Sequence, residues 1–281
     1  MALGQQYPAE WLEYKDPVSG ALMRQLTNVK AHSHHLYFTN PGWYDNGKKL
    51  LFVSERDNAT NVYGMNLADG TFVQLTELPP LENKTTLLNM SKNPQRDEAY
   101  FWANGTLWSL NLANQEINEL TRLPQGFVAT MTSVTADGRY VCTGIYQDLS
   151  KRFRVNLEHG YVGFREYWAA HPLSRILRVE IKTGKTDTIF EERNWIGHIN
   201  TSPTVAHIAS FCHEGPWERV DNRIWGLDIN TGMAWRIRPT APGDTVGHEY
   251  WFADGEHIGF HGRRGPTREP FFGSIRYDNT D

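Results

Sequence analysis

The stretch RIWGLDINTGMAWRIR, residues 223–238, predicts a strand, a tight turn and a second strand. Apolar and polar residues alternate on both sides, and Asn-Thr-Gly supplies the turn between them. Three other stretches have the same layout: NVYGMNLADGTFVQLT at 61–76, TLWSLNLANQEINEL at 106–120 and RILRVEIKTGKTDTIF at 175–190. A hairpin that recurs at intervals indicates a repeat architecture.

The repeat period predicts the fold. Equivalent positions are Leu67, Leu112, Ile181, Ile229 and Tyr277, at spacings of 45, 69, 48 and 48 residues. A second hairpin pattern precedes the first one, as in WYDNGKKLLFV (43–53), SVTADGRYVCT (133–143) and WFADGEHIGF (251–260). Four short antiparallel strands in about 45 residues are typical of a β-propeller blade. The sequence therefore predicts an all-β protein, a β-propeller of four-stranded antiparallel blades.

The same pattern organises the chain as one propeller domain over residues 1–281. Residues 11–28 resemble the outer part of a blade, so we expect about five blades plus one outer strand. Because that arc would be open, we expect the chain to lack a C-terminal part; a closed ring of five or six blades is the alternative. The long interval predicts an insertion around 150–174. The inner strands are expected near 36–43, 85–91, 128–134, 199–204 and 249–253.

Composition excludes several classes of protein. Lys plus Arg number 28 and Asp plus Glu 32, so the net charge of −4 argues against a nucleic-acid partner. The sequence has no apolar run long enough for a membrane span and no signal peptide, so no membrane partner is expected. Two cysteines make no disulfide framework and indicate free thiols in a reducing compartment.

Blade topology gathers several polar side chains at one end of the strands. His198 and His248 precede inner strands, Arg223 and His213 flank the connection between a second and a third strand, and His34 precedes the first complete blade. We expect these five to line one pocket, with His34, His198 and His213 binding substrate. Either His198 or His248 alone could instead only bridge neighbouring blades. No nucleophile elbow, phosphate loop or CxxC or HExxH motif occurs, which leaves proton abstraction from, or recognition of, a small carboxylated ligand.

Four segments carry a resemblance to a known family: HSHHLYFTNPGWYDNGKKLLF (32–52), NWIGHINTSP (194–203), FCHEGPWERVDNRIW (211–225) and GHEYWFADG (247–255). In these segments the chain resembles the oligogalacturonate lyases, whose fold is a seven-bladed propeller. The resemblance implies β-elimination from short, unsaturated oligogalacturonates during pectin breakdown in the cytoplasm, with manganese. It also implies that His248 is the catalytic base and that Arg223 assists at the substrate.

The family's metal ligands, a histidine in the sixth blade and a Gln-x-x-His-x-His cluster, have no match within residues 1–281. The resemblance therefore predicts no metal ligand in this chain, although Mn²⁺ is the expected cofactor of the family. Two alternatives stay open: a non-catalytic propeller that binds a protein or a uronate oligosaccharide, and another uronate-acting lyase or epimerase. The sequence says nothing of the oligomeric state.

The implied chemistry suits these residue types. The proton at carbon 5 of a uronate lies beside a carboxylate, so a cation near that carboxylate stabilises the charge that develops when the proton leaves. The base must be neutral near pH 7, as an imidazole is. Arginine supplies a permanent charge and a planar fork for a carboxylate.

Overall fold

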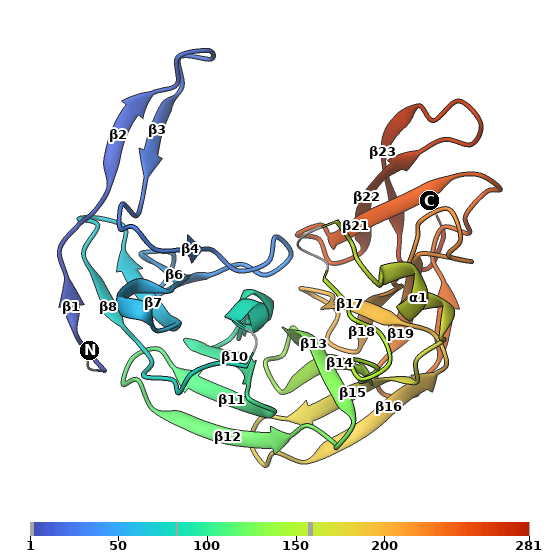
Figure 1. Cartoon of the computed structure of the whole chain (residues 1–281), viewed down its shortest axis with the longest axis horizontal. Helices are drawn as coiled ribbons and strands as arrows, with labels where there is room; N and C mark the ends of the chain where they lie inside the picture. Colours follow the sequence, from blue (N-terminus) through green and yellow to red (C-terminus); the bar gives the residue numbers. More distant parts are fainter. Residues whose placement is uncertain (1–2, 83, 157–159, 281) are drawn as a thin grey trace. The chain divides into compact units, whose positions relative to one another are not determined.

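The computed structural model describes residues 3–82, 84–156 and 160–280. The protein is all-β, and its antiparallel sheets are blades of a β-propeller, which confirms the predicted fold class (Figure 1). The chain divides into two compact units. Unit 1 comprises residues 1–92, 97–104 and 108–118, and unit 2 comprises residues 93–96, 105–107 and 119–281.

The first blade has the strand order β1-β8-β7-β6-β4, with β5 also paired to β6. Its strands are β1 (Gln6–Tyr7), β4 (Ser33–His34), β5 (Trp43–Tyr44), β6 (Lys49–Ser54), β7 (Asn61–Asn66) and β8 (Phe72–Gln74). The 3₁₀-helix η1 (Arg56–Asn58) lies between β6 and β7. The second blade has the order β12-β11-β10-β9, and 3₁₀-helix η2 (Lys84–Asn89) precedes it. Its strands are β9 (Ser91–Lys92), β10 (Glu98–Ala103), β11 (Thr106–Asn111) and β12 (Ile117–Arg122).

Unit 2 contains three further blades. The third has the order β13-β14-β15-β16, the fourth β17-β18-β19-β20, and the last is the three-stranded sheet β21-β22-β23. The third comprises β13 (Phe127–Val134), β14 (Tyr140–Gln147), β15 (Ser174–Glu180) and β16 (Thr186–Glu192). The fourth comprises β17 (Ile196–Thr201), β18 (Ile208–His213), β19 (Ile224–Asp228) and β20 (Ala234–Arg236). The last comprises β21 (Thr245–Trp251), β22 (His257–Arg263) and β23 (Pro270–Arg276).

The N-terminal segment differs from the expected single outer strand. It forms a two-stranded hairpin of β2 (Leu12–Lys15) and β3 (Leu22–Gln25), which extends from the first blade (Figure 1). Asp16 closes the turn, because its Oδ1 accepts hydrogen bonds from the backbone N–H groups of Val18 and Ser19. The prediction missed the second strand because the alternation in WLEYK was not matched to any repeat.

Strand β1, which comprises Gln6 and Tyr7, pairs with β8 and so covers the outer edge of the first blade. Behind β1, the buried guanidinium of Arg56 pairs with Glu10 at 2.8 Å, and only 2% of Arg56 is exposed. Its Cζ lies 4.4–5.9 Å from the centres of four rings, those of Phe72, Tyr7, Tyr63 and Phe52. Such a cation held against ring faces and one carboxylate fixes β1 to its blade.

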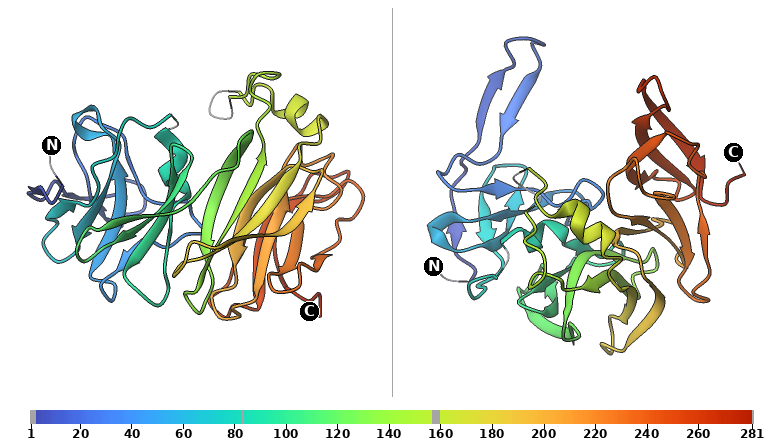
Figure 2. Two further views of the ribbon diagram at one scale, coloured as in Figure 1. Left: turned by 90° about the horizontal axis from the view of Figure 1, so that it is seen from below. Right: turned by 45° about the vertical axis from the view of Figure 1, so that its right-hand side comes forward.

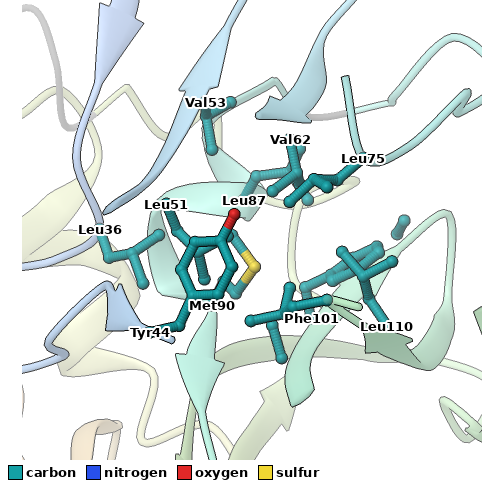
Figure 3. Packing of buried hydrophobic residues seen from close by; sticks show 13 residues of the cluster. Leu36, Tyr44, Leu51, Val53, Val62, Leu75, Leu87, Met90, Phe101 and Leu110 are labelled. Atoms are coloured by element: carbon teal, nitrogen blue, oxygen red, sulfur yellow. The ribbon is translucent and has the colours of Figure 1, made fainter. Parts of the chain in front are cut away.

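The core of unit 1 forms where strands of the first and second blades face each other (Figure 3). Alternate residues of β6, such as Leu51 and Val53, point into it together with Phe101 of β10 and Leu110 of β11. Alternation along each strand supplies this face, as expected for a sheet buried against another sheet.

The inner strands are partly where the sequence predicts them. The prediction for 128–134 matches β13, while those for 199–204 and 249–253 lie about three residues too late, because β17 and β21 begin before their histidines. The predictions for 36–43 and 85–91 were wrong as continuous strands. Within these ranges only Trp43 of β5 and Ser91 of β9 belong to strands, and 84–89 forms η2. The prolines and asparagines near these segments interrupt pairing.

The long interval between repeats contains helix α1 (Phe164–Ala169), between β14 and β15. Residues 157–159 of the predicted insertion lie outside the described residues. Figure 2 shows the segment with α1 beyond one end of the strands of unit 2. The hydroxyl of Tyr167 in α1 donates a hydrogen bond to the carbonyl oxygen of Gln147, which anchors the helix to the end of β14.

Among the described residues, no helix is both long and apolar enough to cross a membrane. Both cysteines are free and buried, as predicted. Burial raises the pKa of the Cys142 thiol to about 12 and that of Cys212 well above its usual range. Neither thiol is therefore reactive in the folded protein at neutral pH.

Candidate active site

Two β-bulges lie in the strands that carry the candidate site in unit 2. In β17 the register with β18 shifts between Ile196 and Ile199, and in β21 the register with β22 shifts between Gly247 and Tyr250. Each bulge contains a histidine that the sequence singles out, His198 in β17 and His248 in β21. A bulge places an extra residue opposite one partner and re-aims its side chain, which is why bulges are frequent beside active sites.

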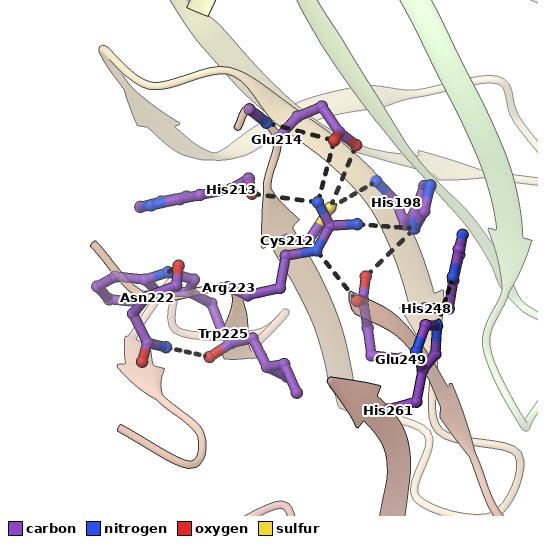
Figure 4. A network of polar contacts seen from close by, with 12 residues as sticks. His198, Cys212, His213, Glu214, Asn222, Arg223, Trp225, His248, Glu249 and His261 are labelled. Atoms are coloured by element: carbon purple, nitrogen blue, oxygen red, sulfur yellow. Dashed lines mark hydrogen bonds and ion pairs between the residues drawn. The ribbon is translucent and has the colours of Figure 1, made fainter. Parts of the chain in front are cut away.

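Arg223 lies at the centre of the polar network (Figure 4). It directly precedes β19 and is 5% exposed. Its Nε donates to Glu249 at 3.2 Å, and its Nη1 donates to Glu214 at 3.0 Å and to the carbonyl oxygen of His213 at 3.4 Å. Its Nη2 lies 3.5 Å from Nδ1 of His198, the longest of these contacts. Two carboxylates and a carbonyl oxygen thus fix the plane of the guanidinium.

Charge pairing decides the ionisation of these buried groups. Burial alone would raise the pKa of Glu249, but the positive charge of Arg223 and the hydrogen bond to His198 outweigh it and hold that pKa far below its usual range. Burial likewise opposes ionisation of Glu214, yet Arg223 keeps its pKa lowered. One guanidinium therefore faces two ionised carboxylates.

His198 connects two blades. Its Nδ1 lies 3.2 Å from Oε1 of Glu249, and its backbone N–H contacts Sγ of Cys212 at 3.2 Å. The preceding Gly197 permits this close packing, because a Cβ there would lie 2.7 Å from Glu214 and 3.0 Å from Cys212. The bridging interpretation of His198 is therefore realised in the structure, alongside its position next to Arg223.

His213 belongs to a second, adjoining network. Its ring is buried, and its two nitrogens lie 2.8 Å from Asp221 and 2.7 Å from Glu192. Burial alone would lower the pKa of His213, but the two carboxylates outweigh it and raise that pKa. The backbone carbonyl oxygen of His213 accepts a hydrogen bond from Arg223, while its ring is held by the two carboxylates. Its role in binding substrate stays a prediction.

His248 is exposed and is paired with another histidine. Its Nδ1 lies 2.7 Å from Nε2 of His261 in β22, and the two rings have centres 4.9 Å apart and planes within 22° of parallel. The edge of Trp217 contacts both rings, with centre distances of 5.7 and 5.8 Å. Burial lowers the pKa of His248, and His261, His198 and Arg223 lower it further, against an opposing effect of Glu249. This imidazole is therefore neutral at pH 7, as a base requires.

The loop that carries Trp217 rests on the inserted helix. Gly215, at φ +143°, lies so close to Trp168 of α1 that a Cβ would come within 2.2 Å of the indole. Arg165 of α1 also forms a 2.8 Å ion pair with Glu218. The insertion after β14 thus supports a loop that contacts the two histidines.

The structure brings together four of the five residues predicted for the pocket, although in different ways. His198 and Arg223 touch, His248 is the chain neighbour of Glu249, and His213 contacts Arg223 only through its backbone. His34 lies in unit 1, in β4, with Nδ1 2.9 Å from the carbonyl oxygen of His35. Its membership of a common pocket stays a prediction.

Neither Glu249 nor Glu214 was predicted as a site residue from the sequence. Each directly follows a histidine that was identified, in the strings HEYW and CHEG. Neighbouring residues of a strand point to opposite faces, and Glu249 is buried while His248 is exposed, so identifying the histidine did not point to the glutamate. The bulge in β21 is the feature that a sequence pattern does not reveal.

Comparison with known proteins identifies the family. The sequence matches the family model of oligogalacturonate lyase over residues 1–274. The chain belongs to the oligogalacturonate lyase family.

Two curated members of this family are similar to the chain. It is 28% identical to the oligogalacturonide lyase of Pectobacterium atrosepticum over 256 residues, and 28% identical to the oligogalacturonate lyase of Dickeya dadantii over 261 residues. These matches cover 91% and 92% of this chain but 64% and 66% of the relatives, so the chain spans about two thirds of their length.

Solved structures of the family have the same fold. An oligogalacturonate lyase in complex with manganese superimposes with a TM-score of 0.89 at 26% identity, covering 100% of this chain and 73% of that one. The oligogalacturonate lyase of Vibrio parahaemolyticus gives a TM-score of 0.83 at 22% identity, covering 99% and 78%, and supports the fold alone.

The manganese of that relative raises the question of whether this chain has suitable ligands. Among the described residues, His198, Cys212 and Glu249 offer donor atoms that lie within 4.8 Å of one another. They do not fit manganese, which prefers carboxylate, carbonyl and water oxygens over a thiol. In addition, Glu249 already accepts a hydrogen bond from Nε of Arg223, and the positive charge of this guanidinium repels a cation at this position.

Proposed function

We propose that the protein is a lyase that cleaves short, unsaturated oligogalacturonates by β-elimination, with His248 as the base. The observation that carries this proposal is that an exposed, neutral imidazole, His248, lies on the blade next to that of Arg223, a buried and rigidly held guanidinium whose charge lowers the pKa of His248, in a family member. The substrate is accordingly a small acidic oligosaccharide, and pectin breakdown in the cytoplasm is the setting that this activity suits.

The proposed reaction uses these residues in the following way. His248 takes the proton from carbon 5 of the uronate ring, the electrons of that C–H bond form the double bond between carbons 4 and 5, and the bond from carbon 4 to the glycosidic oxygen breaks. A proton from water or a nearby donor neutralises the leaving oxygen. Arg223 holds positive charge next to the base, and its Nη2 edge is the part that we assign to the substrate carboxylate.

Manganese, with which a solved relative is in complex, would offset the negative charge of the substrate carboxylate. The group His198–Cys212–Glu249 is not assigned to it, because a thiol and an arginine-bound carboxylate do not suit that ion. A second candidate function follows from this misfit: a propeller that binds a uronate oligosaccharide without cleaving it.

The test is to incubate the protein with unsaturated digalacturonate, with and without Mn²⁺, and to separate substrate and monouronates by chromatography. We expect turnover that falls about 10²–10⁴-fold in His248→Ala. Because the pKa of His248 is lowered, the rate should hold to a lower pH than the ordinary imidazole pKa of about 6.5 and then fall.

The control is His257→Gln, which removes an imidazole at the opposite end of β22, where the ring binds Asp254. Substrate binding without turnover in the wild type would favour the second candidate. Near-normal turnover by His248→Ala would show that the base is a different residue.

A further inference from the structure

We propose that His261 is a positioning residue that fixes His248 in the tautomer with the proton on Nδ1, so that Nε2 keeps the lone pair of the base. This inference deepens the proposed function and rests on the proposed role of His248 as the base. It concerns a residue that the family resemblance does not assign and that the polar cluster around Arg223 does not include.

The bulge in β21 creates the contact. Gly247 is opposite His261, and the next regular pair is Tyr250 with Gly259, so two residues of β21 face one residue of β22. His248 occupies the bulge with φ +52°, a left-handed conformation that is costly for a residue with a side chain. The backbone retains this cost at the position that brings Nδ1 of His248 to Nε2 of His261.

The rings of His248 and His261 are arranged for a hydrogen bond between them. The distance from Nδ1 of His248 to Nε2 of His261 is 2.7 Å, and the rings are within 22° of parallel. Trp217 closes one side with its edge against both rings. Gly247 makes room for it, since a Cβ there would lie 2.5 Å from the indole.

A hydrogen bond between two imidazole nitrogens requires one proton between them. When His248 donates from Nδ1, its Nε2 is unprotonated and is available as a base, and His261 accepts with its Nε2. Once Nε2 of His248 has taken a proton, Nδ1–H becomes a charged donor, and its bond to His261 becomes stronger. An imidazole partner therefore orients the base, as other second partners of histidine do.

Two charged groups near His248, Arg223 and Glu249, are not suited to be such an acceptor. The largest effects on the ring of His248 come from His261, His198, Arg223 and Glu249. Arg223 is a donor only, and the carboxylate of Glu249 is already bonded to Arg223 and His198. The contact to His261 is thus the one to which we assign the selection of the tautomer.

The experiment measures the tautomer directly. Histidine ¹⁵N shifts are recorded for the wild-type chain, with the His248 signals assigned by their loss in His248→Gln. We expect wild-type His248 in the Nδ1–H form. His261→Phe keeps an aromatic ring at this position but has no acceptor, so His248 should move toward the Nε2–H form. His261→Gln retains an acceptor oxygen and should keep the Nδ1–H form.

Turnover provides the second readout. We expect kcat to fall about tenfold in His261→Phe, with KM nearly unchanged, and to recover largely in His261→Gln. His257→Gln is the control in the same strand, and thermal melting checks that each variant folds.

An Nε2–H tautomer in the wild type, or no tautomer change in His261→Phe, would overturn the inference. These results do not depend on activity: a wild type without lyase activity would refute the proposed function, while the ¹⁵N shifts would still decide the role of His261.

Discussion

Glu249 is fully buried and yet ionised, because it lies between a guanidinium and an imidazole. Removing one partner from such a cluster leaves a charge without compensation in a dry environment. This makes Glu249 the residue on which the arrangement of Arg223 and His198 depends most.

Glu249→Gln should therefore destabilise the fold by about 3–5 kcal/mol, since Arg223 would keep only one of its two carboxylates. The measurement is the free energy of unfolding by urea. The matched control is Glu256→Gln, which breaks the partly exposed pair with Arg276 and should cost about 1 kcal/mol or less. Equal costs for the two substitutions would contradict the role assigned to Glu249.

His213 leads to a prediction about pH. Its pKa is raised in the folded protein, so the stability that its proton contributes is fully present below the ordinary pKa of about 6.5 and is lost as pH rises through the folded pKa. The difference in melting temperature between wild type and His213→Gln should therefore be largest on the acid side of neutrality and shrink at higher pH. A difference that grows with pH would refute the protonated state of His213.

The contacts that the sequence does not predict lie at the bulges of β17 and β21. The repeat spacing predicts the blades, and the family segments locate His198, Arg223 and His248. Alternation assigns neighbouring residues to opposite faces, so it cannot place Glu249 beside Arg223 or His248 against His261. Those contacts depend on one extra residue in the ladder, which no hydrophobic period records.

Gly247→Ala tests the bulge of β21. The added Cβ would meet Trp217 at 2.5 Å, so the indole must move away from the two histidines. We expect a loss of stability of about 1–3 kcal/mol, together with a change in tryptophan fluorescence. Gly265→Ala is the control, because its Cβ would meet only atoms at 3.7 and 4.0 Å. An unchanged protein in the first case would mean that Trp217 is not held where the structure places it.

For the whole molecule, the donor atoms of the described residues lead to a prediction about metal. The 281-residue chain should bind Mn²⁺ weakly, because a thiol and an imidazole with an arginine-bound carboxylate do not match its preferred oxygen ligands. Titration calorimetry on the intact chain measures this. Tight, stoichiometric binding that is lost in His198→Ala would show that the cluster around Arg223 rearranges into a metal site.

The short strand β1 has a consequence for solubility. An uncovered sheet edge presents a row of unpaired backbone groups to which other chains can add, and that is how many β-proteins aggregate. By pairing with β8, and through the ion pair between Glu10 and Arg56, the start of the chain shields one such edge and the aromatic residues behind it. Deleting the residues that precede Asp16 would therefore expose this sheet edge. The truncated protein should form light-scattering aggregates at concentrations where the full chain stays clear.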